Sequence, residues 1–360
     1  MEFLPSYKEL KTTLPLLPDQ HRFIEESRQT VRSILNGTDS RLLLIVGPCS
    51  IHDPLSAKEF AKRLCQLAQH VSSHFFIIMR AYCEKPRTSA GWKGFLYDPF
   101  LNGSHAILTG IEWTRQLLLE LTSLQIPVAT EFLDPLTAFY YDDLVTWGSI
   151  GARTASSQIH RNLASNLSMP IGFKNGIAGN VSAAVNGVMV ANHPHTFMSI
   201  CENGKPTIFR TKGNQDAHIV LRGGESGPNY DPSSVSEALA RLEHAQLPPC
   251  LLIDCAHHNS GKKHDKQLAV FQSVIHQILE GNTNIRGLML ESHLHAGNQT
   301  LLSSNPSQLH YGVSITDPCL DWKSTAHLIQ WGAERLQRQF SEIQTCIEVR
   351  TSEIVMKEIC

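Results

Sequence analysis

The sequence lacks the segments that would tie the chain to a membrane. No apolar run approaches the ~20 consecutive residues that a transmembrane helix needs. The first residues, MEFLPSYKELKTTLP, lack the basic flank and apolar core of a signal peptide. We therefore expect a protein with no membrane partner.

Other absences exclude further partners and compartments. The formal net charge is only -2, so no overall basic field favours nucleic acid, and no GxxxxGK(S/T) motif indicates an ATP site. Nine cysteines is an odd number, and no CxxC pair or tight Cys/His repeat accompanies them. This cysteine pattern argues against a disulfide framework and predicts a cytoplasmic protein.

Eight short apolar runs are spaced along the chain, and nearly every one ends on a polar residue. Helical patterns follow the runs, such as SAKEFAKRLCQLAQHV, in which Ser56 is the expected N-cap. This alternation predicts an α/β protein with the architecture of a (β/α)8 TIM barrel. Such barrels place the active site where the carboxyl ends of the strands meet. The residues expected at these ends are Cys49, Arg80, Glu131, Arg153, Lys174, Arg222, His257 and Glu291.

Three segments are expected along the chain. Residues 1–40 form an N-terminal extension, in which Pro18 breaks the chain before a single helix. Residues 41–335 form the barrel, with a helix expected over DPLTAFYYDDLVTW, residues 134–147. Residues 336–360 are expected to form a helical tail.

One stretch breaks the alternation of strands and helices. Residues 195–211 contain two β runs on either side of ENGK, and Asn-Gly is a strong signal for a hairpin turn. A hairpin has no place between a barrel helix and the next strand. We therefore interpret it as a β-hairpin inserted before strand six, with a role in regulation or assembly.

The loop after the second run, RAYCEKPRTSAGWKG, carries Arg80, Lys85, Arg87 and Lys93. Arg and Lys bind phosphate and carboxylate oxygens through charge-assisted hydrogen bonds. Taken by itself, the loop is better explained as a solvated basic patch. Because three further cations end other strands, we expect a barrel mouth that binds at least two anionic groups.

Four residues are candidate ligands of a divalent metal ion. Cys49, His257 and Glu291 end strands that are neighbours in a closed barrel, and Asp317 follows the eighth strand. Their mixed sulfur, nitrogen and oxygen donors suit Mn, Fe, Co or Zn better than calcium. The residue pattern alone leaves three other nitrogen ligands open: His258, His293 and His295.

Eight motifs resemble those of a known enzyme family. They are GPCSIHD, MRAYCEKPRTSAGWKG, GARTASSQIHR, GFKNG, LRGG, IDCAHHNS, ESHLHAGNQ and YGVSITDPC. On these motifs the chain resembles the class I 3-deoxy-D-arabino-heptulosonate-7-phosphate (DAHP) synthases, in the branch regulated by aromatic amino acids. The resemblance implies a metal-dependent condensation of phosphoenolpyruvate with D-erythrose 4-phosphate and water, which gives DAHP and phosphate. This reaction is the first step of the shikimate pathway to chorismate.

The resemblance also implies roles for individual residues. One divalent metal ion would be held by Cys49, His257, Glu291 and Asp317. Phosphoenolpyruvate would be bound by Arg80, Lys85, Arg153, Lys174 and Arg222, and erythrose 4-phosphate by Arg87, Thr88 and Asp317. Four residues would form the catalytic set. Lys85 would protonate the new alkoxide, Glu131 would orient water, and Cys49 and His257 would take part as metal ligands.

Feedback inhibition by an aromatic amino acid is a further implication. The positions that match the family's regulatory pocket are Phe132, Leu163, Leu167, Ser168, Phe197, Ser199 and Phe209. The N-terminal extension would pack against a neighbouring subunit, in a homodimer or homotetramer. Ala138 stands where phenylalanine-sensitive relatives have proline, and Ser199 where tyrosine-sensitive relatives often have glycine. These departures favour phenylalanine or tryptophan as the inhibitor.

Three other functions stay open at this point. The same chemistry on arabinose 5-phosphate is disfavoured by the motif KPRTS, which matches enzymes of the four-carbon sugar. A Schiff-base aldolase would use Lys174 and would need no metal. A barrel that only binds sugar phosphates or aromatic amino acids would lack turnover, although every expected ligand and cation is present.

Overall fold

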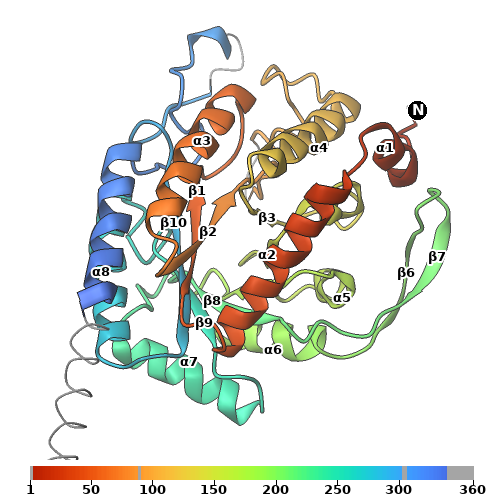
Figure 1. Ribbon diagram of the computed structural model, residues 1–360. Helices are drawn as coiled ribbons and strands as arrows, with labels where there is room; N and C mark the ends of the chain where they lie inside the picture. The colour runs from red at the N-terminus through yellow and green to blue at the C-terminus, as the bar shows by residue number, and fades with distance from the viewer. Residues whose placement is uncertain (1–2, 88–90, 302–305, 339–360) are drawn as a thin grey trace, which may run out of the picture.

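The computed structural model describes residues 3–87, 91–301 and 306–338. Eight parallel strands close into a barrel in the order β1-β2-β3-β4-β5-β8-β9-β10 and back to β1 (Figure 1). They are β1 (Leu42–Gly47), β2 (Phe75–Arg80), β3 (Val128–Glu131), β4 (Trp147–Ile150), β5 (Ile171–Lys174), β8 (His218–Leu221), β9 (Leu251–Asp254) and β10 (Ile285–Glu291). The predicted (β/α)8 barrel is confirmed.

The barrel strands are buried on both faces, and β1 is a continuous apolar run. Every residue of β1, LLLIVG, is buried. Parallel strands that lie between packed side chains inside the barrel and helices outside have this composition. Gly287 of β10 lies against β1, where an added Cβ atom would come within 2.6 Å of the Leu43 side chain. A side chain at Gly287 would therefore open the seam at which the barrel closes.

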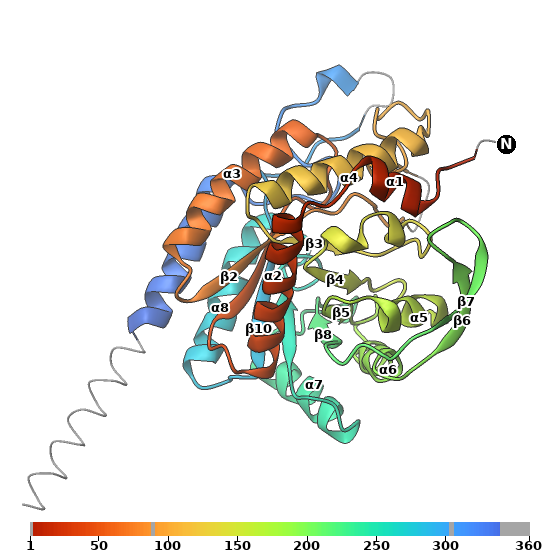
Figure 2. The same ribbon diagram turned by 45° about the vertical axis from the view of Figure 1, so that its right-hand side comes forward.

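Helices cover the outside of the barrel (Figures 1 and 2). They are α3 (Pro54–His70), α4 (Ile107–Ser123), α5 (Gln158–Asn166), α6 (Ser182–Ala191), α7 (Pro232–His244), α8 (Gln267–Leu279) and residues 322–338. The Asp53 side chain accepts hydrogen bonds from the backbone N–H groups of Leu55 and Ser56, so Asp53 is the N-cap of α3. The prediction of Ser56 in that role is wrong, because the helix begins earlier, at Pro54.

The connection between β3 and β4 contains no α-helix, so the helix predicted over residues 134–147 is wrong. Two 3-10 helices take its place: η1 (Ala138–Tyr140) and η2 (Asp142–Leu144). Side chains of this segment bind other elements instead: Tyr141 Oη donates a hydrogen bond to Glu84 Oε1 at 2.6 Å, and Asp143 accepts two from Arg115. These tertiary contacts override the local helical pattern.

Arg115 of α4 is fully buried and links three segments. Its guanidinium donates to both carboxylate oxygens of Asp143 and to the backbone carbonyls of Leu14 and Tyr140. We expect Arg115→Ala to lower the free energy of unfolding by about 3 kcal/mol, because these acceptors lose a charged donor. Urea denaturation measures the change. The exposed Arg22→Ala should change it by less than ~0.5 kcal/mol, and equal effects of the two substitutions would contradict the prediction.

The N-terminal residues form two helices. In α2 (Pro18–Asn36), Pro18 is the first helical residue, so the prediction that it breaks the chain before the helix is wrong; its fixed φ suits the first turn. The sequence pattern does not predict α1 (Tyr7–Thr13), which begins with a capping box between Ser6 and Glu9. In Figures 1 and 2, both helices lie beside other helices and strands of the same chain.

The inserted hairpin is present, as predicted. β6 (Thr196–Ile200) and β7 (Pro206–Arg210) pair antiparallel between α6 and β8, and they project from the side of the barrel (Figures 1 and 2). Its turn contacts α1, where Lys8 N donates to Glu202 O at 3.1 Å. Phe197 and Phe209 pair on one face of the hairpin and stack at 5.8 Å between ring centroids. Phe209 also stacks on Phe139 of η1 at 5.8 Å, so the hairpin is anchored through one face and through its turn.

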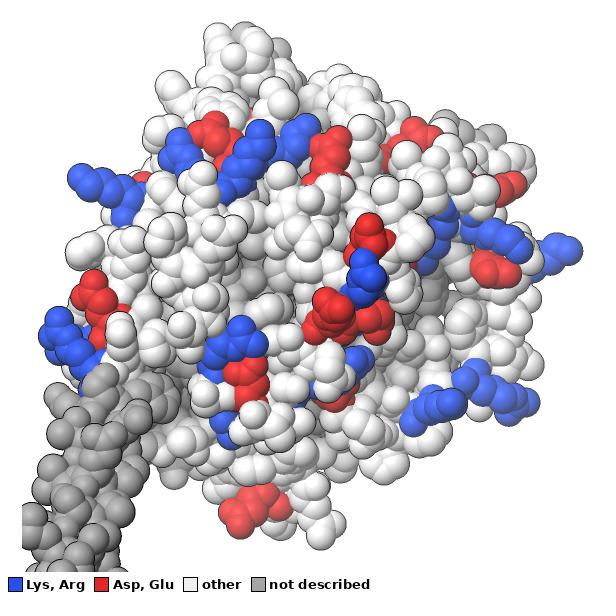
Figure 3. Space-filling model, viewed as in Figure 1, with Lys and Arg blue, Asp and Glu red and all other residues white. Residues whose placement is uncertain are grey.

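The surface carries charges of both signs. Figure 3 shows Lys and Arg side chains interspersed with Asp and Glu, separated by wide uncharged areas. Within the described residues, no helix is both long and apolar enough to cross a membrane. Most of the predicted C-terminal tail, residues 339–360, lies outside the part of the chain that the structure describes. The predicted segment boundaries at residues 40 and 335 stay predictions.

Candidate active site

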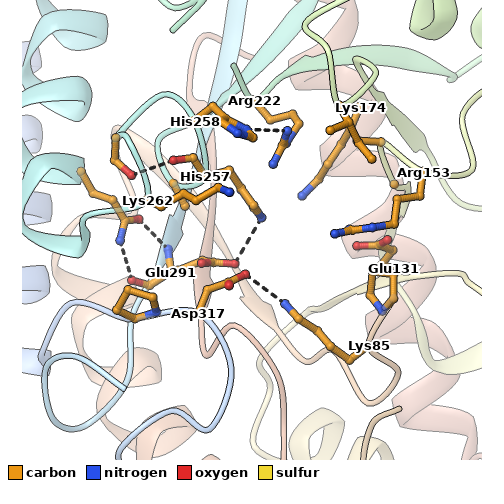
Figure 4. A pocket seen from close by; sticks show the side chains of 18 of the residues that line it. Lys85, Glu131, Arg153, Lys174, Arg222, His257, His258, Lys262, Glu291 and Asp317 are labelled. Carbon is orange, nitrogen blue, oxygen red and sulfur yellow. Dashed lines mark hydrogen bonds and ion pairs between the residues drawn. The ribbon is translucent and has the colours of Figure 1, made fainter. Parts of the chain in front are cut away.

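The carboxyl ends of the barrel strands surround a cavity of about 470 Å³ (Figure 4). The sequence-predicted residues that line it are Arg80, Lys85, Arg87, Glu131, Arg153, Lys174, Arg222, His257, Glu291 and Asp317. Segments far apart in the sequence meet here because β10 pairs with β1, with Glu291 beside Gly47. The roles of these residues stay predictions, but their convergence on one cavity is a property of the structure.

Three acidic side chains form a compact group on one side of the cavity. The sulfur of Cys49 and carboxylate oxygens of Glu291 and Asp317 all lie within 4.8 Å of one another. The Cys49 thiol lies 3.4 Å from Asp317 Oδ2. A thiol and two carboxylates at this spacing fit a divalent transition metal ion.

His257 lies next to this group (Figure 4). Its Nε2 is 3.6 Å from Glu291 Oε1, and its Nδ1 is 3.1 Å from Asp254 Oδ2. Its backbone φ of 57° is in the left-handed region, which non-glycine residues rarely adopt and which is common at functional sites. The imidazole can therefore complete a four-ligand set with Cys49, Glu291 and Asp317.

The other predicted nitrogen ligands have different surroundings. His258 Nδ1 accepts a hydrogen bond from Arg222 Nη1 at 3.0 Å. His293 is buried edge-to-face against His52, with ring centroids 6.0 Å apart, and His295 is exposed. Among the candidate histidines in the described residues, His257 is thus the one that the structure places beside Glu291.

Lys85 lies among the acidic groups. Its Nζ is 2.8 Å from Cys49 Sγ and 3.3 Å from Asp317 Oδ2. Burial lowers the pKa of Lys85, but the Cys49 and Asp317 charges outweigh burial and hold this pKa above its usual value. The Lys85 ammonium holds the pKa of Asp317 well below its usual range, whereas burial and Glu291 raise the pKa of Cys49 to about 12.

Arg80 is buried with one donor unused. Its Nη2 donates to Glu291 Oε1 at 2.8 Å and its Nε to Pro48 O at 3.1 Å, and its guanidinium lies 3.7 Å from the centre of the Tyr82 ring. Its Nη1 is buried with no hydrogen-bond partner among the described residues. Because a buried donor without a partner is unfavourable, this N–H is available for an oxygen atom of a bound anion.

Lys174 forms a buried ion pair with a residue that the sequence analysis missed. Its Nζ lies 2.9 Å from Asp254 Oδ2, and both side chains are almost completely buried. Burial lowers the pKa of Lys174, but Asp254 outweighs that effect and raises it. Asp254 ends the run LLID, and a polar residue at the end of an apolar run is a candidate site residue, which is how the sequence could have indicated it.

Cations and the Glu131 carboxylate lie across the cavity from Glu291 and Asp317 (Figure 4). In Figure 4, Glu131 and Arg153 lie side by side, facing the cavity with Lys174 and Arg222. A Cβ atom at Gly151 would overlap the Glu131 carboxylate, so a larger residue there would displace the end of the Glu131 side chain. Arg87 Nε donates to Trp92 O at 2.7 Å. Thr88 lies outside the described residues.

The segment from the end of β9 to the first residue of α8 adds cavity residues that the sequence analysis did not select. They are Ser260, Lys262, His264 and Gln267. Gln267 exchanges hydrogen bonds with the backbone of Glu291, accepting from its N–H at 2.9 Å and donating to its carbonyl at 3.0 Å. It thereby fixes the end of β10 from which the Glu291 side chain projects.

The predicted regulatory residues lie on one side of the barrel but in different settings. Phe197, Ser199 and Phe209 are half-buried on the hairpin face that meets η1, where Phe209 stacks on Phe139 at 5.8 Å. Three others are buried in the core: Phe132, Leu163 and Leu167. Ser168 is exposed and its Oγ accepts a hydrogen bond from Arg28. A shared regulatory role for these residues stays a prediction.

Comparisons with known proteins cover nearly the whole chain. It is 46% identical over 330 residues to the Tyr-sensitive phospho-2-dehydro-3-deoxyheptonate aldolase of Escherichia coli (strain K12), across 91% of this chain and 92% of the relative. It is 45% identical over 340 residues to the Trp-sensitive aldolase of the same strain, across 94% and 97%. The solved structure of the phospho-2-dehydro-3-deoxyheptonate aldolase from Francisella tularensis SCHU S4 matches with a TM-score of 0.91 at 44% identity, over 94% of this chain and 98% of that chain.

The family model for the DAHP synthetase I family matches residues 20–330. That span contains the barrel, the inserted hairpin and every described residue named above for the cavity. The agreement of sequence, fold and cavity leaves one conclusion: the chain belongs to the DAHP synthetase I family.

Proposed function

We propose that this enzyme condenses phosphoenolpyruvate with D-erythrose 4-phosphate and water, in a metal-dependent reaction that releases DAHP and phosphate. The observation that carries the proposal is a single cavity that is lined by cations and adjoins the group formed by Cys49, Glu291 and Asp317. The names of the relatives support the same reaction class. The product places the enzyme at the first step of the shikimate pathway.

Phosphoenolpyruvate carries a phosphate and a carboxylate, and the cations that line the cavity suit both. We assign its binding to Arg80, Lys85, Arg153, Lys174 and Arg222. The unused Nη1 donor of Arg80 and the protonated Lys174 point to charge-assisted hydrogen bonds with these oxygens. Holding two anionic substrates together against their mutual repulsion is itself a large part of the catalysis.

Cys49, His257, Glu291 and Asp317 would hold one divalent ion, for which Mn, Fe, Co and Zn are the candidates. When bound, such an ion supplies a Lewis acid that polarises the aldehyde of the aldose. The chain's own residues perform the proton transfers. As C3 of phosphoenolpyruvate bonds to the aldehyde carbon, Lys85 gives a proton to the new alkoxide. Glu131 orients the water that adds to the cationic C2. As the C2–O bond to phosphate breaks and the C2 carbonyl forms, one proton of that water leaves with the phosphate and the other restores the Lys85 ammonium.

A Schiff-base mechanism through Lys174 is disfavoured by the electrostatics of its pair. A nucleophilic lysine needs a lowered pKa so that its amine is neutral. Asp254 raises the pKa of Lys174, which keeps the ammonium charged. Borohydride trapping of substrate on Lys174 would favour this alternative instead.

The aldose phosphate is assigned to Arg87 and Asp317, with Thr88 from the same motif. We expect Arg87→Ala to raise the KM for erythrose 4-phosphate by about 10- to 100-fold, because a charge-assisted contact with the phosphate is lost. The KM for phosphoenolpyruvate should change by less than ~3-fold. Steady-state kinetics with each substrate varied in turn measures both constants, and equal effects would contradict this division of the cavity.

We further propose feedback inhibition by an aromatic amino acid, bound by the hairpin residues Phe197, Ser199 and Phe209 with Phe132, Leu163, Leu167 and Ser168. Tyr-sensitive and Trp-sensitive relatives support inhibition of this kind. Ala138 and Ser199 favour phenylalanine or tryptophan. Residues 1–40 are proposed as an oligomer-contacting segment in a homodimer or homotetramer, and the cysteine pattern favours a cytoplasmic location.

One assay tests the proposed function. The purified chain is incubated with phosphoenolpyruvate and erythrose 4-phosphate, and phosphoenolpyruvate consumption is followed with and without a chelator, then with each aromatic amino acid. Consumption that the chelator abolishes and a divalent ion restores is the expected result. Activity that survives complete metal removal would exclude the metal-dependent mechanism, and activity with arabinose 5-phosphate alone would assign the other sugar.

A further inference from the structure

A buried carboxyl group precedes Lys85 in the sequence. Glu84 is 2% exposed, and its Oε1 accepts hydrogen bonds from Thr137 Oγ1 at 2.8 Å and from Tyr141 Oη at 2.6 Å. Its Oε2 is buried and has no hydrogen-bond partner in the part of the chain that the structure describes. A buried polar group left unpaired is unfavourable, a penalty that an apolar side chain would avoid. The reactions proposed above make no use of this carboxyl.

The two donors to Glu84 flank η1, the short helix that packs on the inserted hairpin. Phe139, at the centre of η1, stacks on Phe209 of β7 with ring centroids 5.8 Å apart. The Tyr141 ring lies parallel to that of Phe132, with a centroid distance of 6.0 Å and an angle of 5° between their planes. The segment that receives the packing of the hairpin is therefore the segment that binds Glu84.

On its other side, Glu84 is joined directly to the active site. The next residue, Lys85, places its Nζ 2.8 Å from Cys49 Sγ. The backbone here is tightly packed: Lys85 N donates to Lys93 O at 2.9 Å, and an added Cβ atom on Gly94 would come within 2.7 Å of Glu84 Cα. Because this backbone has little room, a shift at Glu84 moves the base of the Lys85 side chain.

We propose that Glu84 is a positioning residue that couples the β6–β7 hairpin to Lys85. The contacts run from Phe209 through Phe139 and η1 to Thr137 and Tyr141, and from them through Glu84 to Lys85. The role rests on the proposed function, in which Lys85 acts on the substrates. Any ligand or substitution that shifts the hairpin then changes turnover through this carboxyl.

The ionisation of Glu84 provides a signal for this role. Burial raises the pKa of Glu84 to about 7. The titratable groups that interact with it are acidic: Cys83, Tyr97, Asp134 and Tyr141. As pH rises through about 7 the carboxyl loses its proton, and the hydrogen bonds from Thr137 and Tyr141 become charge-assisted and shorter. We therefore expect an inflection near neutral pH in the turnover of the wild-type enzyme that depends on Glu84.

The test compares kcat and both KM values across this pH range for wild type, Glu84→Gln and Tyr141→Phe. Glutamine keeps the size and the acceptor oxygen of Glu84 but cannot ionise. We expect Glu84→Gln to lower kcat about 10-fold above pH 7, with KM within ~3-fold, and to remove the inflection. Tyr141→Phe should also lower kcat, as Glu84→Gln does. The matched control is Tyr140→Phe, whose hydroxyl donates to Pro5 O and should leave kcat within ~2-fold of wild type.

A double-substitution cycle tests the coupling itself. Phe139→Leu removes the stacking on the hairpin, and it is measured in the wild-type and Glu84→Gln backgrounds. If Glu84 carries the coupling, the kcat of the double variant differs at least ~3-fold from the product of the two single effects. Wild-type kinetics and pH profile in both Glu84→Gln and Tyr141→Phe, or multiplicative effects in the cycle, would overturn the role. A wild-type chain that does not consume phosphoenolpyruvate with erythrose 4-phosphate would overturn the proposed function and this role with it.

Discussion

Cys49→Ala is expected to lower turnover at least ~10³-fold and to abolish tight binding of a divalent transition metal ion. The thiolate is the softest donor of the group, and Glu291 and Asp317 lie within 4.8 Å of it and of each other. Removing the sulfur leaves two carboxylates and an imidazole, a set that binds such ions less tightly. Metal content after dialysis, measured by elemental analysis alongside activity, checks the prediction.

The fold should survive this substitution, which separates loss of metal from loss of structure. Cys49 is completely buried, but the change to alanine removes only the sulfur atom. Cys250→Ala is the matched control, since Cys250 is also buried and lies before β9, at the other end of the barrel. It should keep metal content and turnover. Wild-type turnover and stoichiometric metal in Cys49→Ala would show that the cation is held elsewhere.

The barrel was predictable because its information is local. Each barrel strand is a short apolar run, and the order of the runs dictates which side chains reach the mouth. The hairpin was equally visible, since Asn203-Gly204 favours a tight turn and Gly204 adopts a φ of 77°. Barrel closure then brings Cys49 next to Glu291, although the two residues are 242 positions apart in the sequence.

The parts that were missed depend on partners far away in the sequence. The segment 134–147 has helical spacing, yet Tyr141 binds Glu84 and Asp143 binds Arg115, so two 3-10 turns form instead. The sequence also does not predict the direction in which a side chain points. Asp254 ends a run of apolar residues and gives no sign in the sequence that it faces Lys174. Glu84 lies in a basic loop that can be interpreted as solvated, although it is buried.

Lys174→Met is expected to lower kcat/KM for phosphoenolpyruvate by about 10²- to 10³-fold, because an ammonium that meets a substrate oxygen is lost. The same change removes the partner of Asp254, whose carboxylate is completely buried 2.9 Å from Lys174 Nζ. We therefore also expect the free energy of unfolding to fall by about 3 kcal/mol. The exposed Lys263→Met serves as the control and should change neither quantity.

The double variant Lys174→Met/Asp254→Asn separates the two effects. Asparagine removes the unpaired buried charge, so stability in urea should return to within about 1 kcal/mol of wild type. Activity should stay low, because the substrate still lacks its cation and His257 loses the carboxylate 3.1 Å from its Nδ1. Recovery of both stability and turnover in the double variant would show that Lys174 serves only to balance Asp254, and that phosphoenolpyruvate is bound by the other cations of the cavity.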